Sequence, residues 1–260
     1  MVTVDILTIG NEILLGLVLD TNSNYLCRVV RGMGGRVRRI AVVPDEIDEI
    51  VLALRASLDR GTGVVFTAGG LGPTGDDLTL AAVAKAIGKP LVLDSAAAGF
   101  VENKYSDLAA QGHVRSADMT ESRLKMATMP QGSRPVQNPV GAAPACIVGS
   151  QNSQIVSLPG VPAELKAIVE GPLQSFLSEV FGQGSYRERE ILLDCGDESQ
   201  LAPALRQVVA GHPDVYVKSR ASHFGPDVKF RVLLAATAAS AEEAEAKIQR
   251  ASHDLLRLMG

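Results

Sequence analysis

Between residues 2 and 94 the chain alternates short apolar runs with segments of helical periodicity, and this alternation limits the folds open to it. The apolar runs end at Gly10, at Pro44 and at the glycine pair that begins with Gly69. A segment with a helix-like apolar face follows each run. Strands that alternate with helices are joined by crossover connections, which make the strands parallel. The order therefore predicts an α/β fold with a mostly parallel sheet and helices on both faces.

The following part of the chain continues the mixed pattern. Residues 95–129 are expected to be mostly helical, with breaks near Gly112 and before Thr120. The segment 130–160 is rich in Pro, Gly and Asn and contains two strand-like runs joined by a polar turn. A long helix is expected to follow, from about Ala163 to Val180.

A polar, glycine-containing stretch at 182–185 is the best candidate for a domain boundary. It separates a first domain, residues 1–181, from a second, residues 186–260. The second has the order strand, helix, strand, strand, helix, with Asp197 as the expected cap of its first helix. This order predicts a small C-terminal α+β domain. It contains no catalytic or ligand-binding motif, so we interpret it as a packing or dimerisation domain.

The composition excludes several classes of function. With 29 acidic and 25 basic residues the net charge is −4, so no overall field attracts nucleic acid or an anionic membrane. Trp is absent and aromatic residues make up 4%, which argues against a base-stacking surface. A basic run from Arg28 to Arg39 is typical of a solvated surface, with a phosphate or subunit contact as the alternative. We therefore expect neither nucleic acid nor membrane as a partner.

The cysteine and histidine pattern predicts no zinc site. Cys27, Cys146 and Cys195 are scattered among apolar neighbours, which is typical of buried, reduced thiols, and the histidines are isolated. The N-terminus lacks a basic region and an apolar signal core, and no apolar run reaches the ~20 residues that span a bilayer. We expect a cytoplasmic location.

One glycine-rich loop suggests a dinucleotide site. Residues 70–75, GLGPTG, fit G-x-G-x-x-G, follow a strand-like run and precede a helix-like run, and a second apolar run ends at Asp94. Such a loop binds phosphate because its N–H groups point inward without a Cβ in the way, and the dipole of the following helix favours anions. The pattern is that of an NAD-binding Rossmann unit.

The residues of the same loop favour a different ligand chemistry. Pro73 has no N–H to donate, and Asp76 and Asp77 place two anions beside the expected phosphate. The loop also follows the third strand, whereas a Rossmann fingerprint follows the first. A divalent cation reverses the electrostatic sign, because Mg²⁺ bridges carboxylates and substrate phosphates. The alternative is a purely structural role, in which both aspartates only complement the dipole of a helix that starts near Asp76.

Other polar residues follow strand-like runs elsewhere. In an open parallel sheet ligands bind outside the carboxyl ends of the strands, so we expect these turns to converge on one crevice. Each turn taken alone is compatible with a structural role. The turn residues are Gly10, Asn11 and Glu12 after the first strand, Asn22 at the start of the first helix, Asn138 and Gly141 in NPVGAAP, and Pro159, Gly160 and Glu164 in LPGVPAEL.

Four motifs carry a resemblance to a known family: TIGNEILLGLVLDTNSNYL, TAGGLGPTGDDLT, NPVGAAPA and LPGVPAEL. In order and spacing they resemble the N-terminal region of the CinA (competence/damage-inducible) family, within the molybdopterin-binding, MoaB/MogA-like superfamily. The resemblance covers residues 2–180 and extends more loosely through 186–258. It implies a three-layer α/β/α fold with a cleft the size of a nucleotide or a pterin.

The resemblance also implies activities. CinA-type members are divalent-metal-dependent pyrophosphatases of ADP-ribose, a related domain in some FAD synthases hydrolyses FAD, and MogA-like relatives adenylylate molybdopterin. The expected cofactor is Mg²⁺, Mn²⁺ or Co²⁺, with K⁺ as an additional candidate. The expected ligand is a nucleotide or a pterin, and relatives of both branches form homo-oligomers.

Site residues follow from matching positions. Asp76 and Asp77 would lie near the metal, and N–H groups of Gly69, Gly70 and Gly72 would hold phosphate beside Pro73. We expect Thr74 to position a phosphate oxygen or a water, so that Thr74, Asp76 and Asp77 are the candidate catalytic residues. The resemblance places the other binding residues in the remaining turns, namely Glu12, Asn22, Asn138, Gly141, Pro159, Gly160 and Glu164.

The chain departs from the family at two positions and in extent. Gly75 stands where the family has a longer polar residue, and Ala145 where it has glycine. The nicotinamide-mononucleotide deamidase domain of CinA has no counterpart in this sequence, so we expect that activity to reside, if anywhere, in a separate partner chain. The sequence leaves open a molybdopterin- or nucleotide-binding module without turnover, and a scaffold whose ligand site has decayed.

Overall fold

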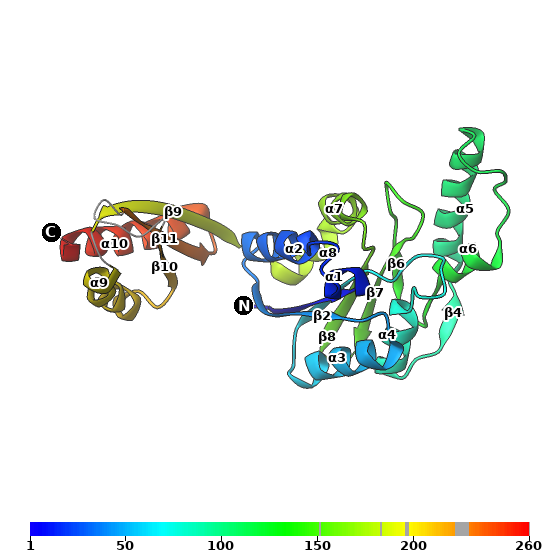
Figure 1. Ribbon diagram of the computed structural model, residues 1–260, viewed down its shortest axis with the longest axis horizontal. Helices are drawn as coiled ribbons and strands as arrows, with labels where there is room; N and C mark the ends of the chain where they lie inside the picture. Colours follow the sequence, from blue (N-terminus) through cyan, green and yellow to red (C-terminus); the bar gives the residue numbers. More distant parts are fainter. Residues whose placement is uncertain (151, 183, 196–197, 222–228, 260) are drawn as a thin grey trace. The chain divides into compact units, whose positions relative to one another are not determined.

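A computed structural model of the chain describes residues 1–150, 152–182, 184–195, 198–221 and 229–259. The chain divides into two compact units, residues 1–30 with 35–180 and residues 31–34 with 181–260. Each unit is built around its own sheet (Figure 1). None of the described helices combines the length and the apolar composition that a bilayer-spanning helix needs.

The first unit contains a six-stranded sheet in the order β2-β1-β3-β8-β7-β6. The first four strands of this order are mutually parallel, whereas β7 runs antiparallel to β8 and β6 antiparallel to β7. This confirms the predicted α/β fold with a mostly parallel sheet. The strand bounds are β1 Thr3–Ile9, β2 Arg36–Val43, β3 Val64–Ala68, β6 Arg134–Val136, β7 Ala145–Ser150 and β8 Ser153–Leu158.

Helices cover both faces of this sheet, with α3 and α4 on one face and α2, α7 and α8 on the other (Figure 1). Strand β3 lies in the middle of the sheet and is buried at every residue. This fits its mostly apolar sequence, because a parallel strand covered by helices on both faces has no solvent-facing side. A smaller sheet of β4 and β5 lies beside α5 and α6. The bounds are α1 Asn11–Leu14, α2 Thr21–Gly32, α3 Ile47–Asp59, α4 Thr79–Ile87, β4 Leu91–Leu93, α5 Ser95–Ala110, α6 Glu121–Met126, β5 Thr128–Pro130, α7 Pro162–Glu170 and α8 Gln174–Phe181.

Several predicted element boundaries are wrong for local reasons. The long helix expected over 163–180 is two helices, because Pro172 cannot donate an N–H to the helix and disfavours helical geometry at Gly171. The helix expected to start near Asp76 begins only at Thr79. The helical expectation for 95–129 missed β5, and the short α1 and β6 had no prediction.

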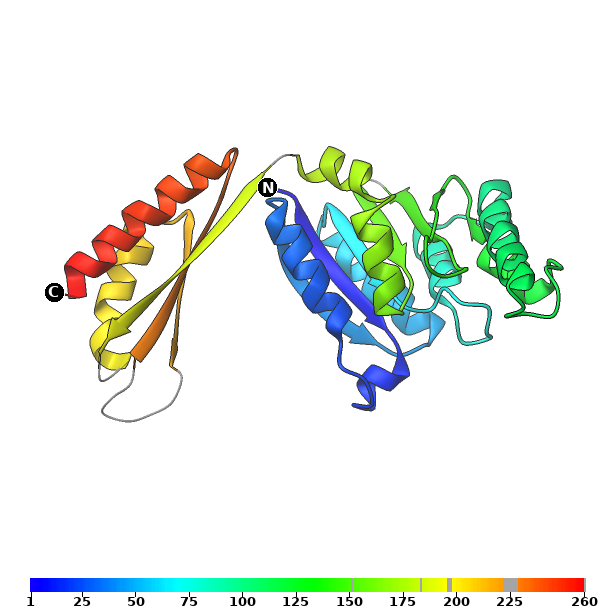
Figure 2. The same ribbon diagram turned by 90° about the horizontal axis from the view of Figure 1, so that it is seen from above.

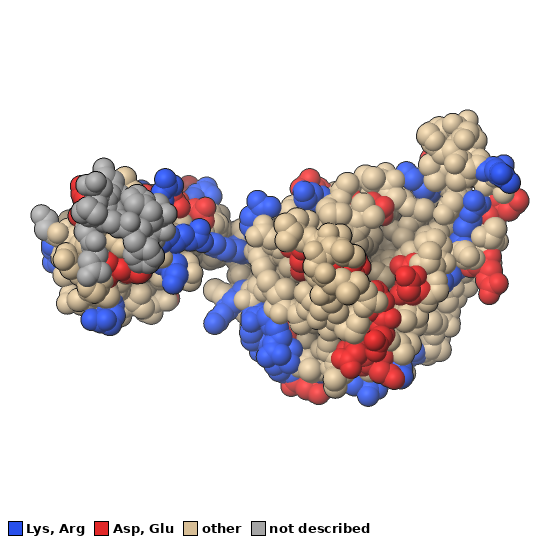
Figure 3. Space-filling model, in the orientation of Figure 1, with Lys and Arg blue, Asp and Glu red and all other residues tan. Residues whose placement is uncertain are grey.

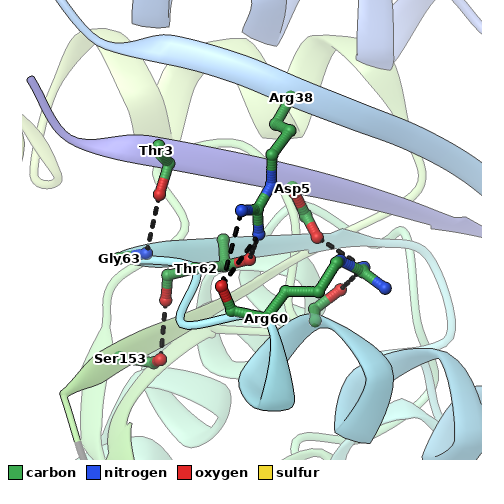
Figure 4. Close-up of polar contacts among 8 residues, drawn as sticks. Thr3, Asp5, Arg38, Arg60, Thr62, Gly63 and Ser153 are labelled. Carbon is green, nitrogen blue, oxygen red and sulfur yellow. Dashed lines mark hydrogen bonds and ion pairs between the residues drawn. The ribbon is translucent and has the colours of Figure 1, made fainter.

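Near the amino-terminal end of β1, a buried carboxylate pairs with an arginine of β2 and with the arginine that follows α3 (Figure 4). Nη2 of Arg60 donates to Oδ2 of the fully buried Asp5 at 2.7 Å, and Nε of Arg38 lies 3.6 Å from Oδ1. Burial alone would raise the pKa of Asp5, but the hydrogen bonds from Arg60 and Ser57 and the two guanidinium charges hold it below its usual value. Arg38 is therefore engaged with the protein interior, which the interpretation of the basic run as a solvated surface missed.

The second unit has the predicted order of strand, helix, strand, strand, helix. Its three strands form an antiparallel sheet in the order β10-β11-β9 (Figure 2). Side chains from the sheet and both helices share one core. The predicted helix cap, Asp197, lies outside the described residues. The bounds are β9 Ser185–Asp194, α9 Glu198–Gly211, β10 Val215–Ala221, β11 Lys229–Ala238 and α10 Ala241–Met259.

Candidate functional site

The carboxyl ends of β1, β3 and β8 border a cavity of about 600 Å³ in the first unit. This is the edge at which parallel α/β sheets bind ligands. The segments that follow the three strands supply most of the lining, and Asp45 after β2, helices α5 and α6, and the segment between β6 and β7 supply the rest.

The cavity brings together the residues predicted from separate turns. Ten of them line it, namely Glu12, Gly69, Gly70, Gly72, Pro73, Asp76, Asp77, Pro159, Gly160 and Glu164. The other six each contact a lining residue, and they are Gly10, Asn11, Asn22, Thr74, Asn138 and Gly141. The predicted convergence of these turns on one crevice is therefore present.

The lining is acidic. Among the described residues five carboxylates line the cavity, and no Lys, Arg or His does so; the five are Glu12, Asp45, Asp76, Asp77 and Glu164. Red side chains gather beside the hollow on the face over α1 in Figure 3. The nearest ammonium group to the loop, that of Lys125, donates to the carbonyl oxygen of Thr74. An anion that enters this cavity unaccompanied meets net repulsion.

Only glycine fits at the start of the loop after β3. The φ of Gly69 is 112°, and a Cβ at this position would overlap the carbonyl oxygen of Ile9. The N–H of Gly69 donates to the carbonyl oxygen of Leu158, and Oγ1 of Thr79 donates to that of Gly69. These bonds tie the loop to the ends of β8 and α4. Gly69 thus lines the cavity but has no N–H to offer a phosphate, contrary to the prediction.

The next three N–H groups are available. Among the described residues, the N–H groups of Gly70, Leu71 and Gly72 donate to no protein acceptor, and all three residues line the cavity. Inward-facing N–H groups in a glycine-rich turn form an anion-binding concavity. The structure therefore leaves a short row of donors beside the acidic side chains.

Two carboxylates converge on one hydroxyl in this loop. Oγ1 of Thr74 lies 2.5 Å from Oδ1 of Asp76 and 2.6 Å from Oδ2 of Asp77. The N–H of Thr74 also donates to Oδ2 of Asp77 at 2.8 Å. The hydrogen bond from Thr74, with further bonding to the backbone and the charge of Lys125, holds the pKa of Asp76 below its usual value. Asp76 is therefore ionised at neutral pH.

A second hydrogen-bond network fixes the carboxylate of Glu164, near the start of α7. The side chain of Asn138 is nearly fully buried and uses all of its hydrogen-bonding capacity. Its Nδ2 donates to Oε2 of Glu164 at 2.7 Å and to the carbonyl oxygen of Ala143, and its Oδ1 accepts from the N–H groups of Val140 and Gly141. Asn138 thereby holds both its own turn and Glu164 in place.

Three of the lining carboxylates each lie directly over a glycine. In each pair, a Cβ added to the glycine would come within 2.6 Å of a carboxylate oxygen, closer than real Cβ contacts occur. The pairs are Glu12 over Gly10, Asp77 over Gly72 and Glu164 over Gly141. Each of these glycines makes room for the carboxylate that faces the cavity.

One wall of the cavity is apolar. Its residues belong to a single hydrophobic cluster and are Leu71, Tyr105, Met126, Ala142 and Ala143. Sequence reasoning missed Tyr105 and Met126, because no motif marks the segment 95–129 from which they come. It also missed Asp45, although Asp45 follows Pro44 at the end of the second strand, where the rule used for the other turns would have found it.

The chain is similar to known proteins over most of its length. Residues 5–179 match the family described as "Probable molybdopterin binding domain". A protein of Pyrobaculum aerophilum is 39% identical over 255 residues, which are 98% of this chain and 93% of the relative. A protein of Aeropyrum pernix is 40% identical over 255 residues, which are 97% and 91% of the two chains.

The chain is also similar to solved structures. A CinA protein of Thermoplasma acidophilum, described as of unknown function, is 36% identical with a TM-score of 0.61, and the match covers 67% of this chain and 98% of that chain. The molybdopterin biosynthesis enzyme MoaB of Thermus thermophilus is 23% identical with a TM-score of 0.46, and the match covers 70% of this chain and 98% of that chain.

Proposed function

The chain belongs to the family of the probable molybdopterin binding domain and is CinA-like, and from this premise we propose that its acidic cavity binds a dinucleotide of the ADP-ribose or FAD type with a divalent cation and hydrolyses its pyrophosphate bond. The observation that carries the proposal is the charge of the cavity, which has five lining carboxylates and, in the described part of the chain, no lining Lys, Arg or His. At ~4 Å and an effective dielectric of ~20, each carboxylate–phosphate pair repels by about 4 kcal/mol. A cation removes this repulsion.

The donor set fits a divalent cation that is held jointly with the ligand. Asp76 and Asp77 place two carboxylates around the Thr74 hydroxyl, and Mg²⁺ characteristically takes one or two carboxylates together with substrate phosphates and waters. No group of three or more His, Cys, Asp or Glu side chains within the described ranges is placed to hold a metal. The site thus fits Mg²⁺, Mn²⁺ or Co²⁺ in the presence of ligand, rather than a cage made by protein alone.

The remaining chemistry belongs to this chain's own residues. When bound, a divalent cation neutralises phosphate oxygens and makes the phosphorus more open to attack. The N–H groups of Gly70, Leu71 and Gly72 bind phosphate oxygens, and Thr74 keeps Asp76 and Asp77 oriented. Oε2 of Glu164 is held by Asn138, so its Oε1 is left to accept the proton of the attacking water.

Hydrolysis of ADP-ribose tests this proposal, because water splits it into AMP and ribose 5-phosphate. We expect product with Mg²⁺ or Co²⁺ and none with EDTA. A binding module without turnover is the second candidate, favoured by the lack of three clustered metal ligands among the described side chains. Ligand binding in Mg²⁺ without any AMP release from ADP-ribose or FAD would establish that second candidate instead.

Two glycines of the same loop provide a matched test. Gly72→Ala is expected to lower kcat/KM about 10- to 100-fold, because the new Cβ displaces the Asp77 carboxylate and small misplacements of a positioned group are costly. Gly75→Ala is expected to stay within about twofold, because a Cβ there meets nothing within 4 Å. Steady-state kinetics at several Mg²⁺ concentrations measure both. Equal kinetics for the two variants would remove Asp77 from the proposed mechanism.

Self-association through one exposed segment is also part of the proposal. Five large apolar side chains at the end of α1 and in the segment that joins it to α2 are between 52% and 85% exposed, namely Leu14, Leu15, Leu17, Val18 and Leu19. Backbone hydrogen bonds to Asn11 and Glu12 fix this segment next to the cavity. A contiguous apolar patch on an ordered segment is typical of a protein interface, and a second copy of the chain is the proposed partner.

The double variant Leu15→Glu/Leu19→Glu is expected to convert an oligomer into a monomer, because it places four buried charges at an interface of two copies. Light scattering after gel filtration measures the mass. The control, Leu52→Glu, changes a single exposed leucine on α3 and should leave the mass unchanged. A monomeric wild type, or an oligomer that survives the double variant, would refute the assignment of this segment.

A further inference from the structure

The cavity combines two chemically different surfaces, and only one is used by the proposed reaction. Carboxylates and loop N–H groups suit a cation and phosphates. The side chains of the apolar wall carry no charge, and apart from the Tyr105 hydroxyl they offer no hydrogen-bonding group to a pyrophosphate, yet they line the same cavity. A ligand that fills the cavity therefore needs a part that is apolar or aromatic.

Tyr105 is the one aromatic side chain that lines the cavity among the described residues. It lies on α5, is partly exposed, and packs against the hydrophobic cluster that forms the wall. A residue needed only to fill that cluster could be aliphatic, as the neighbouring Leu71 and Met126 are. An aromatic ring at the surface of the cavity instead provides a flat face for another ring.

Arg123 on α6 holds this ring in place. The guanidinium carbon of Arg123 lies 3.7 Å from the centroid of the Tyr105 ring, which is a cation–π contact. Nη1 of Arg123 donates to the carbonyl oxygens of Ser116 and Asp118 at 2.9 and 2.6 Å. The guanidinium is thus anchored by the backbone and supports the ring from outside the cavity lining. A ring fixed in advance loses little entropy when a ligand stacks on it.

We propose that Tyr105 is a specificity-determining residue that stacks against the heteroaromatic ring of the ligand, whether purine, flavin or pterin. This inference rests on the proposed function and deepens it, because it names the part of the substrate that the apolar wall recognises. The ring contact selects nucleotides over ring-free pyrophosphates. The acidic loop alone would not make that distinction, because both kinds of ligand carry a diphosphate group.

The test compares ligands with and without a ring in Mg²⁺. Calorimetry measures the Kd of the non-hydrolysable α,β-methylene analogue of ADP-ribose and of ring-free methylenediphosphonate, for wild type, Tyr105→Ala and Tyr105→Phe. Tyr216→Ala, which removes an exposed tyrosine of the second unit, is the control. Thermal melting of each variant shows whether it is folded.

We expect Tyr105→Ala to bind the ADP-ribose analogue about 5- to 100-fold more weakly, with methylenediphosphonate unaffected. Tyr105→Phe keeps the ring and should bind within about threefold of wild type, as should the Tyr216→Ala control. Hydrolysis by Tyr105→Ala should show a raised KM with kcat little changed, because stacking on a remote ring is made equally in the ground and transition states.

Two results would overturn the inference: unchanged binding of the analogue by Tyr105→Ala, or an equal loss for both ligands, which would mark a structural role. Failure of the proposed function looks different. A wild type that binds the analogue through Tyr105 but never hydrolyses ADP-ribose keeps the ring contact and loses the reaction. If the wild type binds none of the three ligands (the analogue, FMN and 6-hydroxymethylpterin), both the ring contact and the proposed function are overturned.

Discussion

Asp77→Asn is expected to lower kcat/KM for ADP-ribose hydrolysis about 10²- to 10³-fold, the loss typical for one group that stabilises transition-state charge. Asparagine has nearly the same shape and still offers an oxygen to the N–H of Thr74, so the loop keeps its hydrogen bond. What it lacks is the negative charge that attracts a cation. The measurement is steady-state kinetics across a range of Mg²⁺ concentrations, where excess Mg²⁺ should restore part of the lost rate.

The control for this variant is Asp107→Asn, which removes an exposed carboxylate on α5 that does not line the cavity. It should leave kcat/KM and the Mg²⁺ dependence unchanged. Wild-type kinetics for Asp77→Asn would exclude Asp77 from metal binding. An equal loss at every Mg²⁺ concentration, together with a lowered Tm, would assign it a structural role in the loop.

Arg60→Met is expected to lower the free energy of unfolding by about 3–5 kcal/mol, because it leaves the buried Asp5 carboxylate without its main partner. Arg38 is the other cation near this carboxylate, and its Nε is 3.6 Å away. For a chain of this size the loss corresponds to a fall in Tm of about 10 °C. Urea unfolding followed by circular dichroism measures it.

Two comparisons make this prediction specific. Arg231→Met removes an exposed arginine that lies 3.7 Å from Glu190, and such a surface pair contributes at most about 1 kcal/mol. The double variant Asp5→Leu/Arg60→Met removes both charges and should recover much of the stability lost by Arg60→Met. A loss by Arg60→Met no larger than that of Arg231→Met would show that Asp5 does not depend on Arg60.

The pH dependence of this pair has a defined sign. The pKa of Asp5 is lowered in the folded protein, so its stabilising contribution is fully present above the unfolded value of ~3.9 and is lost as the pH falls through the lower folded pKa. In the Arg60→Met variant the effect of burial on Asp5 is no longer offset by the Arg60 guanidinium, so the pKa of Asp5 in the folded variant is expected to rise. The stability difference between wild type and variant should therefore begin to shrink above about pH 4, as the pH falls through the raised folded pKa of the variant, and should shrink further as the pH falls through the lowered pKa of the wild type.

The acidic side of the cavity could be predicted from the sequence because its residues follow strands. Glu12, Asp77 and Glu164 come from the segments that follow β1, β3 and β8, and the carboxyl ends of neighbouring parallel strands meet at one edge. The same rule applies to Asp45 after the second strand. The glycines could be recognised from the sequence as loop formers. The sequence does not show that three of them each lie beneath a carboxylate, because this depends on the positions of the side chains.

The apolar wall could not be predicted in this way. Tyr105 and Met126 are far apart in the sequence and lie on helices, and their place beside the cavity follows from how α5 and α6 pack on the cluster beneath them. Tertiary packing of this kind leaves no local pattern. The hydrogen bond of the Gly69 N–H could not be predicted either, because its acceptor is the carbonyl oxygen of Leu158 on another strand.

Two predicted helix boundaries were wrong, because local backbone constraints overrode the helical pattern of the sequence. Glu170 is the last residue of α7, because Pro172 interrupts an otherwise continuous helical pattern. At the other site α4 begins at Thr79, because Asp76 and Asp77 are taken up by their hydrogen bonds with Thr74. Both aspartates therefore belong to the turn before the helix, and a dipole-complementing role explains them less well than a role in the loop.

The most direct test of the central claim is the affinity of the wild-type protein for the α,β-methylene analogue of ADP-ribose, measured by calorimetry in Mg²⁺ and again in EDTA. An acidic cavity that admits a diphosphate only with a cation predicts binding in Mg²⁺ and at least a ~100-fold higher Kd in EDTA, since removing the cation restores several kcal/mol of repulsion. The same Kd in both solutions would contradict the account, because the carboxylates would then accept the diphosphate without any cation between them.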